Sequence, residues 1–202
     1  MTPDDFASKT GVSRETIEKL KRYQSLLEKW QAKINLVSAT TLPEIWERHF
    51  YDSWQIVSHL GNARVLADIG SGAGFPGLVI AACRPDLEIH SVDSDSRKIA
   101  FQIDVARELG LKIKFHAARN EALAGKLMAD VVAARALAPL PQLLAWARPL
   151  LAPGGLCTFL KGATYADELT AAESAWHMDV QVVPSLSESD AALLLIRDPQ
   201  PK

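Results

Sequence analysis

Hydrophobic positions divide the 202-residue chain near residue 61 into two parts with different periodicities. In the first part apolar side chains recur every three or four residues, which is typical of amphipathic helices. One helix is expected to begin after Ser13, a favourable N-cap, and another after Thr41, where Glu44 would complete a capping box. Their apolar stripes would contain Ile17, Leu20, Tyr23, Leu27 and Trp30 in the first helix, and Trp46, Phe50, Trp54 or Ser53, and Val57 in the second. We therefore predict that residues 1–61 form a helical arm.

From residue 62 onward, short apolar runs alternate with helical patterns. The expected strands are residues 64–69, 87–93, 112–117, 130–133, 156–161, 180–183 and 191–197, and the expected helices end at Cys83 or cover 95–109, 139–151 and 165–177. This alternation predicts an α/β fold with a mostly parallel, doubly wound sheet. Only the last two strands lack room for a helix between them, which predicts an antiparallel hairpin at one edge. Residues 62–202 are thus expected to form one Rossmann-like core on which the arm packs.

Composition narrows the class of protein. Apolar residues make up 48% of the chain and charged residues 23%, which is ordinary for a globular protein and excludes intrinsic disorder. No apolar run approaches the roughly 20 residues that span a bilayer, and the first residues lack the apolar segment of a secretory signal. Cys83 and Cys157 have neither metal-ligand nor CxxC spacing, so they are interpreted as thiols in a reducing compartment. No metal site is predicted.

The net charge of −2 hides two basic segments. Residues 19–33 hold five basic side chains and one acidic, and residues 97–119 hold six basic and two acidic. Such segments are either solvated helix surfaces or parts of a surface that binds phosphates, and charge alone leaves both interpretations open.

A glycine-rich turn follows the first predicted strand and reads Asp68-Ile69-Gly70-Ser71-Gly72-Ala73-Gly74-Phe75-Pro76-Gly77. Glycines allow a ligand to approach the backbone closely, and the carboxyl ends of parallel strands are where open α/β sheets bind ligands. The turn matches the dinucleotide pattern GxGxxG, and a plain strand–helix turn is the structural alternative. The acid two residues before the first glycine gives D-x-G-x-G-x-G, which resembles the first motif of S-adenosylmethionine-dependent methyltransferases. There the carboxylate orders the loop and helps to hold the cationic amino end of the ligand.

Further polar residues end the following strands. Asp93 lies 23 residues after Gly70 and can accept both hydroxyls of a ribose, as NAD and S-adenosylmethionine each require. Asn120 and Glu121 follow the third strand, where they would either border an adenine or simply begin a helix. Arg135 follows the fourth strand, where its guanidinium could contact a carboxylate, a phosphate or guanine O6, unless it is merely a surface arginine.

The second helix of the arm carries a smaller polar group. His49 and Asp52 share one face with Ile45, and Arg48 stands four residues before Asp52. Taken locally, these residues predict a helix-surface ion pair beside a packed histidine. Lys161, which ends the fifth strand, would contact an RNA phosphate or cap the sheet edge.

From about Trp30 to Gly162 the sequence closely resembles the bacterial ribosomal small-subunit methyltransferase G family, also known as glucose-inhibited division protein B. The resemblance rests on the glycine turn and on these further segments: Asn35-Leu36-Val37-Ser38, Glu47-Arg48-His49 with Asp52-Ser53, Val92-Asp93-Ser94 with Arg97-Lys98, Arg135-Ala136, and Leu160-Lys161-Gly162. The family commonly has Ser or Thr where this chain has Ala134, an aromatic residue in place of Leu137, and asparagine in place of Gln31.

The resemblance implies a cytoplasmic enzyme of class I methyltransferase fold that methylates N7 of one guanine in 16S ribosomal RNA. With the motifs above, it gives a cofactor-binding set of Asp68, Gly70, Gly72, Gly74, Phe75, Asp93, Asn120, Glu121 and Arg135. The catalytic set is Arg135, His49 and Asp52, which would position the substrate, because N7 has a free lone pair and no proton to lose. The predicted RNA-binding set is Arg48, Arg97, Lys98, Lys112, Lys114 and Lys161. The expected partner is 16S ribosomal RNA or the small subunit, and the expected oligomeric state is a monomer.

Two other functions remain compatible with the motifs. One is an NAD(P)-dependent oxidoreductase, which would need a hydride-transfer group such as Tyr-x-x-x-Lys, although none of the three tyrosines provides it. The other is a non-enzymatic RNA- or ribosome-binding module that keeps a vestigial cofactor pocket.

Overall fold

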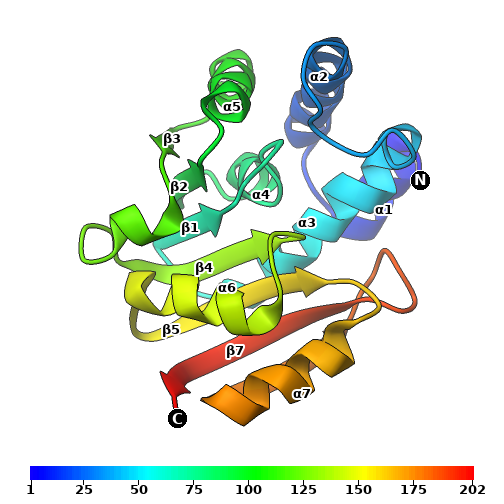
Figure 1. Cartoon of the computed structure of the whole chain (residues 1–202). Coiled ribbons are helices and arrows are strands. Elements are labelled where there is room, and N and C mark those ends of the chain that lie inside the picture. Colours follow the sequence, from blue (N-terminus) through cyan, green and yellow to red (C-terminus); the bar gives the residue numbers. More distant parts are fainter.

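The computed structural model describes residues 1–202 and contains a seven-stranded sheet in the order β3-β2-β1-β4-β5-β7-β6 (Figure 1). The strands are β1 Val65–Ile69, β2 Glu88–Asp93, β3 Ile113–Ala117, β4 Ala129–Arg135, β5 Leu151–Lys161, β6 Trp176–Pro184 and β7 Ala192–Pro201. The first five are parallel, and β7 is antiparallel to both β5 and β6. The predicted α/β fold and antiparallel hairpin are confirmed. The hairpin folds back, so β7 lies inside the sheet and β6 forms the edge.

Helices cover both faces of this sheet (Figure 1). They are α1 Pro3–Thr10, α2 Arg14–Gln31, α3 Asp52–Trp54, α4 Gly77–Cys83, α5 Ser96–Leu109, α6 Leu140–Ala147 and α7 Tyr165–Ala175, with 3-10 turns at Leu42–Glu44, Gln55–His59, Asn120–Leu123 and Arg148–Leu150 and a π-helical turn at Trp46–Tyr51. One core cluster joins α6 and α7 to the sheet, and a second joins α4 and residues 56–60 to the other face. A third cluster joins the arm to α4 and α5, so the arm packs on the core through apolar side chains.

The arm differs from the prediction in two places. A helix that was not predicted, α1, is capped by Thr2, whose hydroxyl and Asp5 form a capping box, and it buries Phe6 completely. The capping box expected at Thr41 is absent, because this residue is itself in helical conformation and its hydroxyl donates to Ser38 O.

The second helix of the arm is also less regular than predicted. Residues 42–59 form 3-10, π and α turns in succession instead of one regular helix. Ser53, rather than Trp54, is the fully buried member of the predicted stripe. The π turn changes the phase of the helix, so a sequence pattern based on regular α-helix spacing misplaces the residues that follow it.

Helix boundaries in the core follow local chemistry. α5 starts after Asp95, whose carboxylate accepts from Arg97 N, and ends at Gly110 in the left-handed conformation, as predicted. α6 is shorter than expected because Pro149 lacks an N–H and stops it, and residues 153–155 belong to β5 instead of ending a helix.

No helix combines the length and the apolar character needed to cross a membrane. Neither cysteine forms a disulfide, and burial raises the pKa of both thiols to about 12.

Candidate active site

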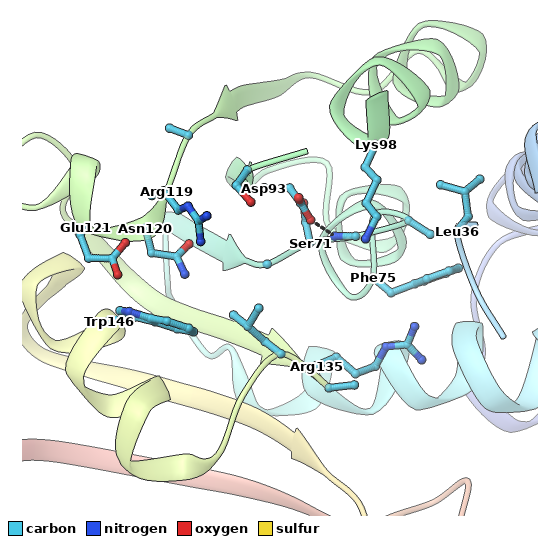
Figure 2. A pocket seen from close by; sticks show the side chains of 17 residues that line it. Leu36, Ser71, Phe75, Asp93, Lys98, Arg119, Asn120, Glu121, Arg135 and Trp146 are labelled. Carbon is cyan, nitrogen blue, oxygen red and sulfur yellow. Dashed lines mark hydrogen bonds between the residues drawn. The ribbon is translucent and has the colours of Figure 1, made fainter. Parts of the chain in front are cut away.

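A first cavity of about 400 Å³ lies at the carboxyl ends of the parallel strands, where the strand order reverses between β1 and β4 (Figure 2). Reversal points of this kind are where open α/β sheets bind ligands. The cavity is lined chiefly by residues 70–73, 93–94, 118–121 and 135–137, each of which directly follows or ends a strand. Its volume falls within the roughly 300–1,000 Å³ typical of small-molecule sites.

The glycines of the turn have different roles. Gly70, Gly72 and Gly74 all have positive φ angles, of 62°, 56° and 90°, which side chains disfavour. A Cβ at Gly72 would meet only open space, its nearest neighbour being Gly70 O at 3.9 Å, so this backbone is free for a ligand. Gly74 does not line the cavity, because a Cβ there would lie 2.7 Å from Tyr23 Oη and would also clash with Leu78. The structure therefore assigns Gly74 to packing and not to cofactor contact.

Asp68 is fully buried beneath the loop and does not line the cavity. Its Oδ2 accepts a hydrogen bond of 2.8 Å from Gly77 N, which ties the start of α4 to the end of β1. A Cβ at Gly77 would lie 2.6 Å from this oxygen, so the glycine is required for the approach. Burial raises the pKa of Asp68 to about 7. The predicted ordering of the loop by this carboxyl is present, whereas the predicted direct contact with a ligand is not supported by its position.

Asp93 faces the cavity from the end of β2 (Figure 2). Its Oδ2 accepts from Gly72 N at 2.8 Å and its Oδ1 accepts from Asp95 N at 2.8 Å. Each carboxylate oxygen has a second lone pair, so both can still accept a ribose hydroxyl. The same side chain thus shapes the glycine loop and presents acceptors to a ligand.

A buried amide that the sequence analysis missed holds the loop from below. Gln102 of α5 donates through Nε2 to Ser71 Oγ and to Gly72 O, both at 2.8 Å, and accepts from Ser91 Oγ. It is fully buried. A glutamine on the apolar face of an amphipathic helix is the signal by which this residue could have been identified.

The opposite end of the cavity is a slot between a turn and a helix. Asn120 and Glu121 lie on the turn after β3, and Trp146 of α6 lies below them (Figure 2). Asn120 is not an N-cap, because it is the first residue of its turn, and Arg119, which precedes it, makes no side-chain cap. Trp146 was not predicted as a site residue, because helical spacing makes it resemble a core residue. An indole facing an amide and a carboxylate suits a planar ring with polar edges, such as adenine.

Arg135 ends β4 between the first cavity and a second cavity of about 690 Å³, and it lines both. Its side chain is only 17% exposed, which excludes the surface-arginine interpretation. Its Nη1 donates to Arg48 O at 3.0 Å and lies 3.7 Å from Asp52 Oδ2, and its guanidinium lies 4.8 Å from the Phe75 ring centroid. The residue therefore joins the core to the arm at the boundary of the two cavities.

His49 lines the second cavity and is held in a neutral state. Its ring stacks on Phe75 at a centroid distance of 5.0 Å, and its Nε2 lies 2.9 Å from Thr41 Oγ1. The Thr41 hydroxyl also lies 3.2 Å from Ser38 O, so it links the imidazole to the main chain. Burial, with the nearby charges of Arg135 and Arg48, lowers the pKa of His49 to about 3. A positioning role for His49 agrees with this arrangement.

The predicted ion pair between Arg48 and Asp52 is wrong. Asp52 Oδ1 instead accepts from Ser187 Oγ at 2.7 Å and from Gln55 Nε2 at 2.8 Å, while Arg48 pairs with Glu188 at 2.5 Å. The π turn disturbs the i,i+4 spacing on which the prediction relied, and the loop between β6 and β7 supplies the new partners. Burial raises the pKa of Asp52, although the Arg135 cation opposes that shift.

The three residues that depart from the family pattern, Leu137, Ala134 and Gln31, lie in or near the two cavities. Leu137 packs against Gly70 and lines both cavities, while Ala134 is fully buried in β4. Gln31 holds the segment that borders both cavities: its Oε1 accepts from Leu36 N at 3.0 Å and its Nε2 donates to Val37 O at 2.8 Å. The longer glutamine thus makes contacts that position this wall.

The predicted RNA-binding residues do not form one surface. Lys98 points from α5 into the first cavity (Figure 2). The Lys161 side chain is 7% exposed, and its ammonium pairs with Glu168 at 2.6 Å and donates to Ala138 O. It therefore joins the end of β5 to α7 and is not a free phosphate contact.

Three members of that set are exposed on the α5 and β3 side of the molecule. Lys112 is exposed just before β3, and Lys114 on β3 pairs with Glu88 at 2.7 Å. Arg97 is exposed at the start of α5 and pairs with Asp95 at 2.8 Å.

Solved structures share this architecture. The O-methyltransferase TomG from Streptomyces achromogenes, solved with S-adenosylmethionine, matches with a TM-score of 0.59 and 13% identity over 89% of each chain. TrmN from Thermus thermophilus matches with a TM-score of 0.56 and 20% identity, covering 78% of this chain and 52% of that one. The fold is therefore that of the class I S-adenosylmethionine-dependent methyltransferases.

The sequence comparisons are more specific. The family described as rRNA small subunit methyltransferase G matches residues 16–194. The ribosomal RNA small subunit methyltransferase G of Paramagnetospirillum magneticum is 50% identical over 200 residues, covering 98% of this chain and 96% of that protein. Its counterpart in Rhodospirillum rubrum is 49% identical over 197 residues, covering 97% of each. The chain belongs to the rRNA small subunit methyltransferase G family, which confirms the resemblance noted from the motifs.

The donor set of the first cavity fits S-adenosylmethionine, the cofactor of this family. Asp93 would hold the ribose hydroxyls, and the slot at Trp146 would take the adenine. The bare backbone at Gly72 leaves space for the methionine portion, and the cations of Lys98 and Arg135 suit its carboxylate.

Proposed function

We propose that the chain transfers a methyl group from S-adenosylmethionine to N7 of one guanine in 16S ribosomal RNA. The supporting observation is that the two cavities share Leu36 and the segment 135–137 at their boundary. A methyl donor in the first cavity and a base in the second would meet at this boundary. The family to which the chain belongs supports ribosomal RNA as the substrate.

The chemistry needs alignment more than proton transfer. When bound, S-adenosylmethionine supplies a methyl group on a positively charged sulfur. The N7 lone pair forms the new C–N bond while the C–S bond breaks and its electron pair goes to sulfur, leaving a positive charge on the base. Holding the reacting atoms in line can provide much of the acceleration, because N7 carries no proton.

The residues at the boundary agree with a base-free reaction. Segment 135–137 presents a guanidinium and two apolar side chains, with no carboxylate, amide or aromatic group. His49 would be a poor base with a pKa of about 3, and Asp52 already accepts two hydrogen bonds. Arg135 keeps N–H donors free to orient guanine O6 beside N7.

An RNA substrate must deliver one base into a cavity that lies within the protein surface. Enzymes that modify bases extrude the target nucleotide from its stack, and exposed cations hold the neighbouring phosphates. Arg97, Lys112 and Lys114 are available on the α5 and β3 side for this purpose. We place the enzyme in the cytoplasm as a monomer that acts on 16S ribosomal RNA, free or within the small subunit.

The test is methyl transfer with identification of the product. Purified protein and labelled S-adenosylmethionine are incubated with 16S ribosomal RNA and, separately, with small subunits lacking the modification. Digestion should yield 7-methylguanosine as the labelled nucleoside. The control variant Glu173→Gln, on the exposed face of α7, should behave like the wild type.

Calorimetry with S-adenosylhomocysteine and NADH separates the remaining alternatives. Binding of the first ligand alone is expected. Binding of NADH in its place would support an oxidoreductase, and binding of cofactor and RNA without methyl transfer would support a non-enzymatic module.

A further inference from the structure

The second cavity has one wall made by the loop between β6 and β7, which lies beside α3 (Figure 1). Three contacts fix this loop to the arm. Ser187 Oγ donates to Asp52 Oδ1 at 2.7 Å, Leu186 N donates to Gln55 Oε1 at 3.1 Å, and Arg48 pairs with Glu188 at 2.5 Å. The wall is therefore held in position before any substrate arrives.

Of the three carboxylates that line this cavity, Glu188 alone retains an oxygen that accepts no hydrogen bond and approaches no cation. Asp52 accepts two hydrogen bonds through Oδ1, and its Oδ2 lies 3.7 Å from Arg135 Nη1. Glu168 accepts from Leu140 N and Thr164 Oγ1 and pairs with Lys161. Glu188 contacts Arg48 through Oε1 only, and its side chain is 33% exposed, against 16% and 19% for the other two.

We infer that Glu188 recognises the target base by accepting hydrogen bonds from N1–H and N2–H₂ of guanine, an inference that rests on the proposed function. These two donors stand side by side on one edge of guanine, and a carboxylate offers two acceptors to match them. Adenine has an acceptor at N1, which a carboxylate repels. Glu188 therefore selects guanine over adenine.

The positions of the residues agree with the geometry of a purine. N7 and the N1–N2 edge lie on opposite sides of the guanine ring system. If N7 faces the boundary at Arg135, the N1–N2 edge points away from the first cavity. Arg135 lines both cavities, whereas Glu188 and Arg48 line the second alone. The carboxylate also stabilises the positive charge that the base acquires during methyl transfer.

The experiment replaces the methylated guanosine, once mapped, with inosine. Inosine keeps N7, O6 and N1–H but lacks the 2-amino group. Wild-type kcat/KM should be about ten- to a hundredfold lower for inosine, because a hydrogen bond to a charged acceptor is lost. Glu188→Ala should lower kcat/KM for guanosine and bring the two substrates within about threefold of each other. Glu188→Gln, which keeps the size of the side chain, should give an intermediate ratio.

The ratio of the two substrates does not depend on how much of a variant is folded. Asp190→Asn, an exposed carboxylate in the same loop that does not line the cavity, should keep the wild-type ratio. Arg48→Gln breaks the ion pair and leaves the carboxylate, so it should slow both substrates and also keep the ratio.

An unchanged ratio in Glu188→Ala would show that Glu188 only holds the loop and would overturn the inference. A wild-type enzyme that methylates guanosine at N7 and inosine equally well would overturn it too, while leaving the proposed function intact. Absence of any 7-methylguanosine with wild-type protein would overturn both.

Discussion

The two cavities are built in different ways. The first is bounded mostly by residues at or just after strand ends, and its bracing contacts span short stretches of sequence, such as Asp68 to Gly77 and Gly72 to Asp93. The second is bounded by side chains from the arm, β4 and the β6–β7 loop. Its contacts join residues as far apart as Asp52 and Ser187. A ligand site held by contacts between residues close in sequence can be recognised from a sequence motif. A site held by contacts between residues far apart in sequence can be recognised only in the folded structure.

Arg135 belongs to both cavities, so its substitution gives the largest expected effect. Arg135→Ala removes a donor from the reaction boundary and leaves the partly buried Asp52 carboxylate without its cation. We expect kcat/KM for RNA methylation to fall about 10²–10³-fold. Affinity for S-adenosylhomocysteine, measured by calorimetry, should fall less than about tenfold.

Arg135→Lys separates charge from geometry. A lysine supplies a point charge and cannot reproduce the planar fork, so it should restore little activity. Full recovery of kcat/KM by lysine would show that charge alone matters. An equal loss of cofactor affinity and of rate in the alanine variant would assign Arg135 to the first cavity only.

Asp93 tests the first cavity alone. Asp93→Ala removes the acceptors for a ribose and the brace on Gly72 N, so the dissociation constant for S-adenosylhomocysteine should rise about ten- to a hundredfold. Asp95→Ala, which removes a neighbouring acid outside the cavity, is the matched control. A change below about twofold in Asp93→Ala would mean that the ribose lies elsewhere.

Substitution of His49 tests the second cavity, and we expect it to lower the methylation rate less than Arg135→Ala does. His49→Gln should keep methylation within about tenfold of wild type, whereas loss of a true general base usually removes about 10²–10⁴-fold. Single-turnover rates from pH 6.5 to 8.5 should show no titration that disappears in the variant. A pH step lost in His49→Gln would contradict the base-free reaction.

The same residue should affect stability in acid. Its pKa is about 3 in the folded protein against an ordinary value of 6.5, so protonation favours the unfolded chain. The stabilisation from neutral His49 is complete above pH 6.5 and is lost as the pH falls toward 3. Thermal unfolding of His49→Gln should therefore depend less on pH between 6.5 and 4 than that of the wild type.

Lys112 gives the smallest expected effect, since it lies outside both cavities. Lys112→Glu should weaken RNA binding about two- to fivefold at low salt, and this difference should shrink as the salt concentration rises. Filter binding at several salt concentrations measures it, with cofactor affinity as the control. RNA affinity that does not respond to salt would indicate that this basic segment is only a solvated surface.

Local signals predicted the core well. Asp95 and Gly110 delimit α5, and Asp68 and Gly77 define the loop, because caps, turns and glycine conformations depend on a few neighbouring residues. The strands and their alternation with helices could also be predicted, because apolar periodicity depends on neighbouring residues. The position of β7 between β5 and β6 depends on how the hairpin folds back, which no local pattern specifies.

Residues that act across distance were predicted poorly. Lys161 carries a charge that suits a phosphate contact, yet Glu168 on the next helix neutralises that charge. Arg48 has an acid four residues later and pairs with Glu188 instead. In the sequence, Trp146 and Gln102 resemble ordinary helix residues. In the fold, Trp146 lines the slot of the first cavity and Gln102 holds the glycine loop. In each case the partner comes from another element, so the role of the side chain is a property of the tertiary structure.

The π turn at Trp46–Tyr51 makes the length of this segment as important as its composition. Asp52 N donates to Glu47 O, one residue further back than in an α-helix, so the turn holds one residue more than a regular helix would. Because the extra residue is accommodated within one turn, deleting one residue inside Trp46–Tyr51 would restore α-helical bonding and would leave Asp52 and Gln55 close to their partners on the β6–β7 loop. Deleting one residue from the regular helix α2 would instead rotate the residues that follow by about 100°. In a deletion scan, the fold should therefore tolerate the loss of one residue in the π turn better than the loss of one residue in α2.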